Sequence, residues 1–310
     1  MKKLFISILA IATFAACSND EAIFMSQDNV IDFGNPFVEN STRATDPSYS
    51  GTATFAAFNV WGTVNGGNGT VAIFANDNVT GSVGANSVWT STKKNYWVKD
   101  AKYNFAALAN AGAVTLGTDK LPATVEYTAN QTDLVYAKST EYTGKESGNE
   151  LVKLTFNHLL SLVNFTVNNG SQSATGYSFN VKNIKIAGAS AGKYYIQAAN
   201  GKAAGTWEAT ANDGYTINTI TVNNSIASAD CGTALLVIPG TVTVSFDVET
   251  CVAENGTPVV IGSKSYSKSN ITLAAGNSYN FIVEPKVGEE IKFNVESNPT
   301  WTPNANITIQ

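Results

Sequence analysis

The sequence predicts an all-β protein built from β-sandwiches. The chain has 310 residues, of which only 14% are charged, and it is rich in Thr, Asn, Gly, Ala and Val. After residue 50, short apolar stretches alternate with Gly/Asn/Asp turns, and no apolar pattern with a 3.6-residue period is sustained. Such composition and spacing are typical of extracellular β proteins, and the length suffices for two domains.

The first element is an export signal. A pair of lysines precedes the apolar run Leu4–Phe14, which is too short to cross ~30 Å of hydrocarbon but suits a signal peptide. Two alanines then lead directly to Cys17. We expect a bacterial lipoprotein in which residues 1–16 are removed and Cys17 becomes the lipid-bearing first residue. The alternative is an ordinary secretory signal followed by a chance cysteine.

The next element is a short extended patch and a polar linker. Val30, Ile31 and Phe33 belong to the patch, with Ile31 and Phe33 on one face. The linker holds Arg43, the single arginine of the chain. A protease specific for arginine would cut once, between Arg43 and Ala44, unless this arginine stands there by chance.

Alternating or continuous apolar runs predict the strands of the body. The candidate strands are Thr54–Thr63, Val71–Ala75, Tyr103–Leu108, Asp133–Ala137, Leu151–Phe156, Leu162–Val167, Ser178–Ile186, Lys193–Gln197, Tyr215–Val222, Ala234–Ile238, Val242–Val248, Val259–Ile261, Tyr279–Val283, Ile291–Val295 and Ala305–Gln310.

A polar stretch near the middle of the chain, Asn168–Ser173, is the most linker-like segment of the body. We therefore predict an N-terminal sandwich over residues 44–169 and a C-terminal sandwich over 170–310. They follow the signal peptide and a propeptide over 17–43.

Two cysteines remain if Cys17 is lipidated. Cys231 and Cys251 flank an expected hairpin formed by Ala234–Ile238 and Val242–Val248. Either a disulfide joins them or both are unpaired buried thiols.

Sequence motifs for catalysis or metal binding are absent. The single histidine, His158, lies in an apolar segment and is expected in the core, and nothing supplies a transition-metal site, a phosphate loop or a catalytic triad. The scattered carboxylates leave a glycosidase pair open without indicating one. We expect neither cofactor nor metal, no enzyme activity and, with a net charge of −5 and no basic patch, no nucleic-acid partner.

The last candidate strand resembles the first patch. Ile307 and Ile309 alternate with polar residues, and nearby prolines favour an extended arm. Residues 305–310 could pair within their own domain or add to the sheet of another subunit.

Several segments in order resemble the fimbrillin-like (FimA/Mfa-like) proteins of Bacteroidetes, which build type V pili. The segments are Phe14–Cys17, Ile31–Phe33 with Thr42–Thr45, Asp133–Ala137, Leu154–Leu160 with Val163–Val167, and Leu273–Phe281.

The resemblance implies two transthyretin-like β-sandwich domains in tandem and a maturation pathway. An Arg-specific protease would cut after Arg43, the strand around Val30–Phe33 would leave, and the donor strand of another subunit, Ala305–Gln310, would fill the groove. Subunits would join head-to-tail. The lipidated precursor would lie at the outer membrane and the mature subunit in the extracellular fimbrium, contributing to adhesion.

Two other functions compete with a pilus stalk subunit. A monomeric surface lipoprotein that binds glycan or host protein would use some of the five tryptophans and twelve tyrosines, although these residues more often pack cores and interfaces. The other competing function is an enzyme, but the sequence shows no recognisable set of catalytic residues. Blocking the cut at Arg43 would distinguish the pilus subunit from the binding lipoprotein and the enzyme.

Overall fold

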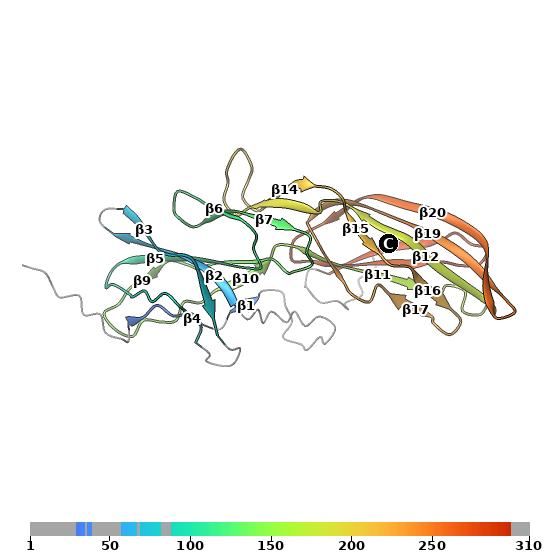
Figure 1. Ribbon diagram of the computed structural model, residues 1–310, viewed down its shortest axis with the longest axis horizontal. Helices are drawn as coiled ribbons and strands as arrows, with labels where there is room; N and C mark the ends of the chain where they lie inside the picture. Colours follow the sequence, from blue (N-terminus) through green and yellow to red (C-terminus); the bar gives the residue numbers. More distant parts are fainter. Residues whose placement is uncertain (1–28, 35, 39–56, 67–68, 82–87, 299–310) are drawn as a thin grey trace, which may run out of the picture.

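The computed structural model describes residues 29–34, 36–38, 57–66, 69–81 and 88–298. Over these residues the regular structure is β-strand and no α-helix occurs, which confirms the all-β prediction. No helix in the described ranges is long and apolar enough to span a membrane. Figure 1 shows an elongated molecule in which β2–β5 and β8–β10 occupy one half and β11, β12, β19 and β20 the other.

The first sheet has eight strands, in the order β1-β10-β8-β5-β2-β3-β4, with β9 also paired to β5. Its strands are β1 (Phe37–Val38), β2 (Ala57–Gly66), β3 (Gly69–Thr80), β4 (Thr90–Ser91), β5 (Lys102–Ala109), β8 (Val135–Lys138), β9 (Tyr142–Thr143) and β10 (Thr155–His158). All neighbours are antiparallel except β1 and β10.

A four-stranded antiparallel sheet, in the order β14-β13-β7-β6, lies over one face of the first sheet in Figure 1. Its strands are β6 (Val114–Leu116), β7 (Pro122–Thr128), β13 (Ala191–Tyr195) and β14 (Thr206–Ala211). Strands from both halves of the sequence therefore meet in this sheet.

Two five-stranded sheets form the other half of the molecule. One has the order β17-β11-β21-β22, with β18 also on β11, and the other has the order β15-β12-β19-β20, with β16 also on β12. Their strands are β11 (Ser161–Asn168), β12 (Tyr177–Ala187), β15 (Tyr215–Ile217), β16 (Ile220–Asn223), β17 (Ser228–Asp230), β18 (Leu235–Val237), β19 (Gly240–Glu254), β20 (Thr257–Leu273), β21 (Ser278–Glu284) and β22 (Lys292–Asn298).

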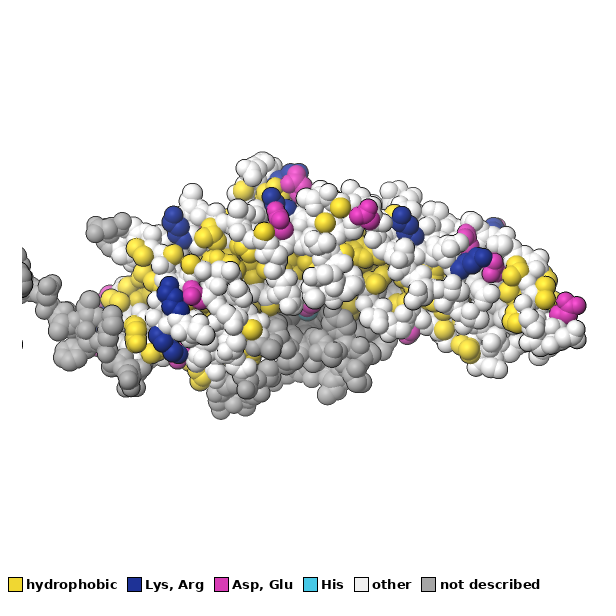
Figure 2. All heavy atoms as spheres, viewed as in Figure 1, with side chains coloured by type: hydrophobic (Ala, Val, Ile, Leu, Met, Phe, Trp, Pro, Cys, Tyr) yellow, Lys and Arg dark blue, Asp and Glu magenta, His cyan; other side chains and the backbone are white. Residues whose placement is uncertain are grey.

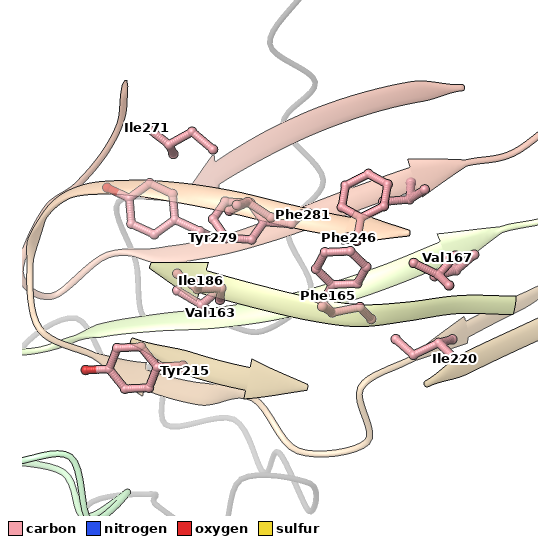
Figure 3. Close-up of a cluster of buried hydrophobic side chains, with 14 of the residues drawn as sticks. Val163, Phe165, Val167, Ile186, Tyr215, Ile220, Phe246, Ile271, Tyr279 and Phe281 are labelled. Carbon is pink, nitrogen blue, oxygen red and sulfur yellow. The ribbon is translucent and has the colours of Figure 1, made fainter. Parts of the chain in front are cut away.

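The core of this second half lies between its two sheets. The alternation in β19 buries Val242, Val244, Phe246 and Val248, while the residues between them are less buried. In Figure 3, Phe246 and Phe165 of β11 point toward one another, with ring centroids 5.8 Å apart. Two inward faces with period-2 apolar patterns thus make this half a β-sandwich.

The first sheet is covered on both faces. Alternate residues of β2 point to opposite sides: Phe58 and Val60 belong to one buried cluster, and Trp61 belongs to another. The cluster around Trp61 also contains Val125 and Tyr127 of β7, so the four-stranded sheet covers that face. The opposite face carries the cluster that contains Ile31 and Phe33.

The chain passes from the first half to the second between β10 and β11. These strands lie in different sheets, and the two residues that join them, Leu159 and Leu160, are both buried. By sheet membership the change comes before the boundary expected after Asn169, because Ser161–Asn168 already pairs with strands of the second half.

The expected hairpin across Pro239–Gly240 is wrong. β18 pairs with β11, whereas β19 pairs with β12 and β20 in the other sheet. Gly240 has a φ of 146°, in the region that favours glycine, and the chain crosses there from one sheet to the other. The two apolar runs therefore face one another across the core instead of sharing an edge.

Candidate functional site

Residues 29–34, which we call the inserted strand, lie hydrogen-bonded within the first half of the molecule. Phe33 exchanges both backbone bonds with Trp89, with its N 2.9 Å from the Trp89 carbonyl oxygen and its own oxygen 2.8 Å from the Trp89 N. The amide of Ile31 donates to the carbonyl of Asn95 at 2.8 Å. These bonds and bridges have the antiparallel pattern.

The other edge of the inserted strand is also paired. The amide of Gly34 donates to the carbonyl of Val152 at 2.9 Å, and the amide of Val152 donates to the carbonyl of Asp32 at 2.9 Å. Further along the chain, β1 continues the parallel pairing onto β10. The inserted strand is thus bonded on both sides, like an interior strand of a sheet, and its removal would leave unpaired backbone groups along both walls.

The side chains of the inserted strand fill the core of this half. Ile31 is 1% exposed and Phe33 is fully buried. The Phe33 ring makes edge contacts with Phe58, Phe74 and Phe105, at centroid distances of 5.8, 5.8 and 6.1 Å. Burial of two such side chains contributes about 3–6 kcal/mol. Of the residues predicted to form the removable strand, Ile31 and Phe33 therefore lie in one buried cluster, and Val30 is partly buried. We call the space that the inserted strand fills the groove.

A glycine allows the floor of this groove to close. A Cβ on Gly62 would lie 2.8 Å from a ring carbon of Phe74 and 2.9 Å from one of Phe105. The same two rings contact Phe33. Any larger residue at position 62 would push them into the space that the inserted strand occupies.

Polar contacts hold the start of the inserted strand. The Asn29 side chain is buried, donates to the Glu146 carbonyl and accepts from Asn149, both at 2.8 Å. Asp32 and Lys94 form an ion pair at 3.7 Å, which is partly exposed and contributes little. The amide network therefore fixes the register at this end more firmly than the ion pair does.

The remaining predicted residues of the maturation pathway lie outside the part of the chain that the structure describes. They are Cys17, Arg43, Ala44, Ile307 and Ile309. The sequence analysis did not identify the residues that pair with the inserted strand and form the groove walls, which are Trp89, Asn95 and Val152. Nothing local marks these residues, because their partners are distant in the sequence.

Cys231 and Cys251 are not bonded to each other. Cys251 is buried in β19, and Cys231 follows β17 in the opposite sheet. The Sγ of Cys231 donates to Asn164 Oδ1 at 3.0 Å, and the Sγ of Cys251 accepts from Asn180 Nδ2 at 3.5 Å. Burial raises the pKa of both thiols, which keeps them protonated. Of the two alternatives, the structure has the unpaired thiols.

The histidine expected in the core is buried, but it has a polar partner. His158 Nδ1 lies 2.8 Å from Asp133 Oδ2 at the end of β10, next to the crossing between the halves. No group of three or more metal-ligating side chains occurs in the described ranges. The first half of the molecule thus holds the inserted strand in its core and has the His158–Asp133 pair at the end of β10.

Comparison with known proteins gives a family match. The family model of fimbrillin-like proteins matches residues 42–299. No curated protein matches this chain.

Solved structures share the fold. A fimbrial protein from Bacteroides vulgatus has a TM-score of 0.60 at 17% identity, with 88% of this chain and 100% of that chain covered. A candidate cell adhesion protein from Bacteroides ovatus has a TM-score of 0.52 at 15% identity, with 90% of this chain and 100% of that chain covered.

Proposed function

The chain belongs to the fimbrillin-like family, and from that premise we propose that it is a pilus stalk subunit that polymerises by strand exchange. Its role in this proposal is structural and not enzymatic. The precursor is exported as a lipoprotein through Cys17, held at the outer membrane, cut after Arg43 by an Arg-specific protease and incorporated into an extracellular fimbrium.

The observation that supports this proposal most is the inserted strand itself. It is paired on both edges and buries Ile31 and Phe33, yet it precedes the single arginine. A cut after Arg43 would leave the whole inserted strand on the discarded side. The groove would then present two unpaired backbone walls and an apolar floor, which are the features that strand addition uses.

The cut at Arg43 does not alter the residues that line the groove. It breaks the covalent link between the inserted strand and the groove, so that another strand can compete for the same place. In the intact chain the inserted strand is tethered to its own groove, which gives it an effective concentration of about millimolar or more. After the cut it is an untethered ligand, held by its backbone pairing and by two buried side chains. A donor strand with Ile307 and Ile309 at the same spacing can then replace it, and its own tether to the incoming subunit makes the exchange lasting.

The tryptophans give little support to the alternative, a monomeric glycan-binding or host-binding lipoprotein that would stack sugars on an aromatic face. Trp61, Trp89 and Trp97 are each at most 4% exposed and pack in the two cores of the first half. Among the described tryptophans only Trp207 is partly exposed, so these tryptophans do not form a broad face for sugar stacking.

Blocking the cut tests the proposal. Arg43→Ala should accumulate as a lipidated, unpolymerised precursor, and Arg43→Lys should do the same because an Arg-specific enzyme distinguishes the two cations. Fibre ladders on gels and electron microscopy of the cell surface give the readout. Normal fibres from Arg43→Ala would overturn the maturation pathway, and normal fibres from a chain lacking residues 305–310 would overturn the donor assignment.

A further inference from the structure

A cavity of about 600 Å³ opens on the face of the first sheet opposite the inserted strand. Its lining comes from β2, β3, β5, β6 and the β5–β6 loop. Figure 2 shows exposed hydrophobic side chains over the half of the molecule that holds these strands. Its volume is in the range of small-molecule sites. Because alternate residues of β2 point to opposite faces, Asn59 and Trp61 line this cavity while Phe58 and Val60 line the core of the groove.

Side-chain amides form one wall of the cavity. Asn59, Asn76 and Asn110 all line it, and Asn59 Nδ2 donates to Asn76 Oδ1 at 2.7 Å. That bond leaves Asn59 Oδ1 as an acceptor and Asn76 Nδ2 as a donor, neither of them bonded to any part of the described chain. The wall therefore offers donors and acceptors side by side, as hydroxyl groups require.

The backbone is shaped to present these amides. Asn76 is the extra residue of a β-bulge, since Val60 pairs with Asp77 and Trp61 pairs with Ala75. Asn76 has a φ of 69° and Asn110 a φ of 58°, both in the left-handed region. Bulges and left-handed residues redirect side chains, and they concentrate near binding sites.

The floor of the cavity is apolar. Leu108 and Trp61 are at most 3% exposed and line it. None of the described lining residues is charged.

We propose that this cavity binds a neutral saccharide of one or two rings. The unbonded amide groups of Asn59 and Asn76 meet its hydroxyls, and the apolar floor meets its C–H face. An anionic sugar finds no cation in the lining. The site lies on the opposite face of the sheet from the inserted strand, so saccharide binding does not depend on polymerisation or on the proposed pilus function.

Titration of the full chain in a detergent without sugar groups tests this proposal. The probes are lactose, maltose and cellobiose, with glucuronic acid as the anionic comparison, followed by tryptophan fluorescence and saturation-transfer NMR. At least one neutral probe should bind saturably below about 20 mM. Asn76→Gly keeps the left-handed backbone and removes the amide, and it should weaken binding about fivefold.

Asn255→Gly is the matched control, because Asn255 also has a positive φ, 49°, but lies in the β19–β20 turn of the other half. It should bind like the natural chain. Absence of saturable binding by all three neutral probes, or equal affinities for Asn76→Gly and Asn255→Gly, would overturn the proposal.

Discussion

At the scale of single residues, Phe33 anchors the inserted strand in the core of the first half. Its ring contacts three phenylalanines and its backbone exchanges two hydrogen bonds with Trp89. The sequence showed that Ile31 and Phe33 share a face, because side-chain alternation is local. It could not show which rings they meet, because those partners are tens of residues away and nothing in the local pattern identifies them.

Phe33→Ala in the full chain removes a fully buried ring and should lower the free energy of unfolding by about 3–5 kcal/mol. Val30 is the control, since it is only partly buried, and Val30→Ala should cost less than about 1 kcal/mol. Urea denaturation followed by tryptophan fluorescence measures both. Similar midpoints for the two variants would mean that the inserted strand does not contribute to the core.

Buried tyrosines predict a loss of stability at alkaline pH. Burial raises the pKa of Tyr103, Tyr136 and Tyr194 above the usual value for a phenol, and Asp119 raises that of Tyr136 further. Above about pH 10 the unfolded chain releases these protons while the folded chain retains them, so the free energy of unfolding falls as pH rises.

Urea midpoints measured from pH 8 to pH 11 should therefore be flat at first and then decline. Tyr136→Phe removes one titrating group and should make the decline shallower. A midpoint that does not change up to pH 11 would contradict the burial of these phenols.

At the scale of elements, periodicity identified strands better than it identified partners. β19 was visible from its strict alternation, and its observed bounds contain the predicted ones. β7 and β14 were missed because they read PATVEYT and TWEATA, with a proline or a charge breaking the pattern. β20 was predicted too short, since most of its residues are exposed and pairing with β19, not burial, extends it.

The first sheet offers a direct test of packing at the groove floor. Gly62→Ala should destabilise the chain by about 1–3 kcal/mol, because the new methyl group would overlap the Phe74 and Phe105 rings. Gly66→Ala lies in the same strand with nothing within 4 Å of its Cβ, and it should change stability by less than about 0.5 kcal/mol. Thermal unfolding compares the two variants. Equal melting temperatures would show that the Phe74 and Phe105 rings can move aside for the methyl group.

At the scale of the whole molecule, two surfaces of one sheet serve separate purposes in this account. One face receives a strand, which joins subunits, and the other carries the amide-lined cavity. Composition and turn spacing were enough to predict the all-β class, since they are properties of the whole chain. The crossing at Leu159 and Leu160 was not predictable, because it falls in a short apolar gap between the predicted strands Leu151–Phe156 and Leu162–Val167, and only the sheet partners reveal the change.

The central claim is that the groove of the inserted strand accepts the C-terminal strand of another subunit once the chain is cut. Binding of a synthetic peptide of residues 299–310 to purified subunits measures this directly. The peptide should bind the chain cut after Arg43 and freed of residues 17–43, should fail to bind the uncut precursor, and should lose binding when Ile307 and Ile309 are both replaced by Asp. Equal binding to cut and uncut chains, or no binding to either, would contradict the account.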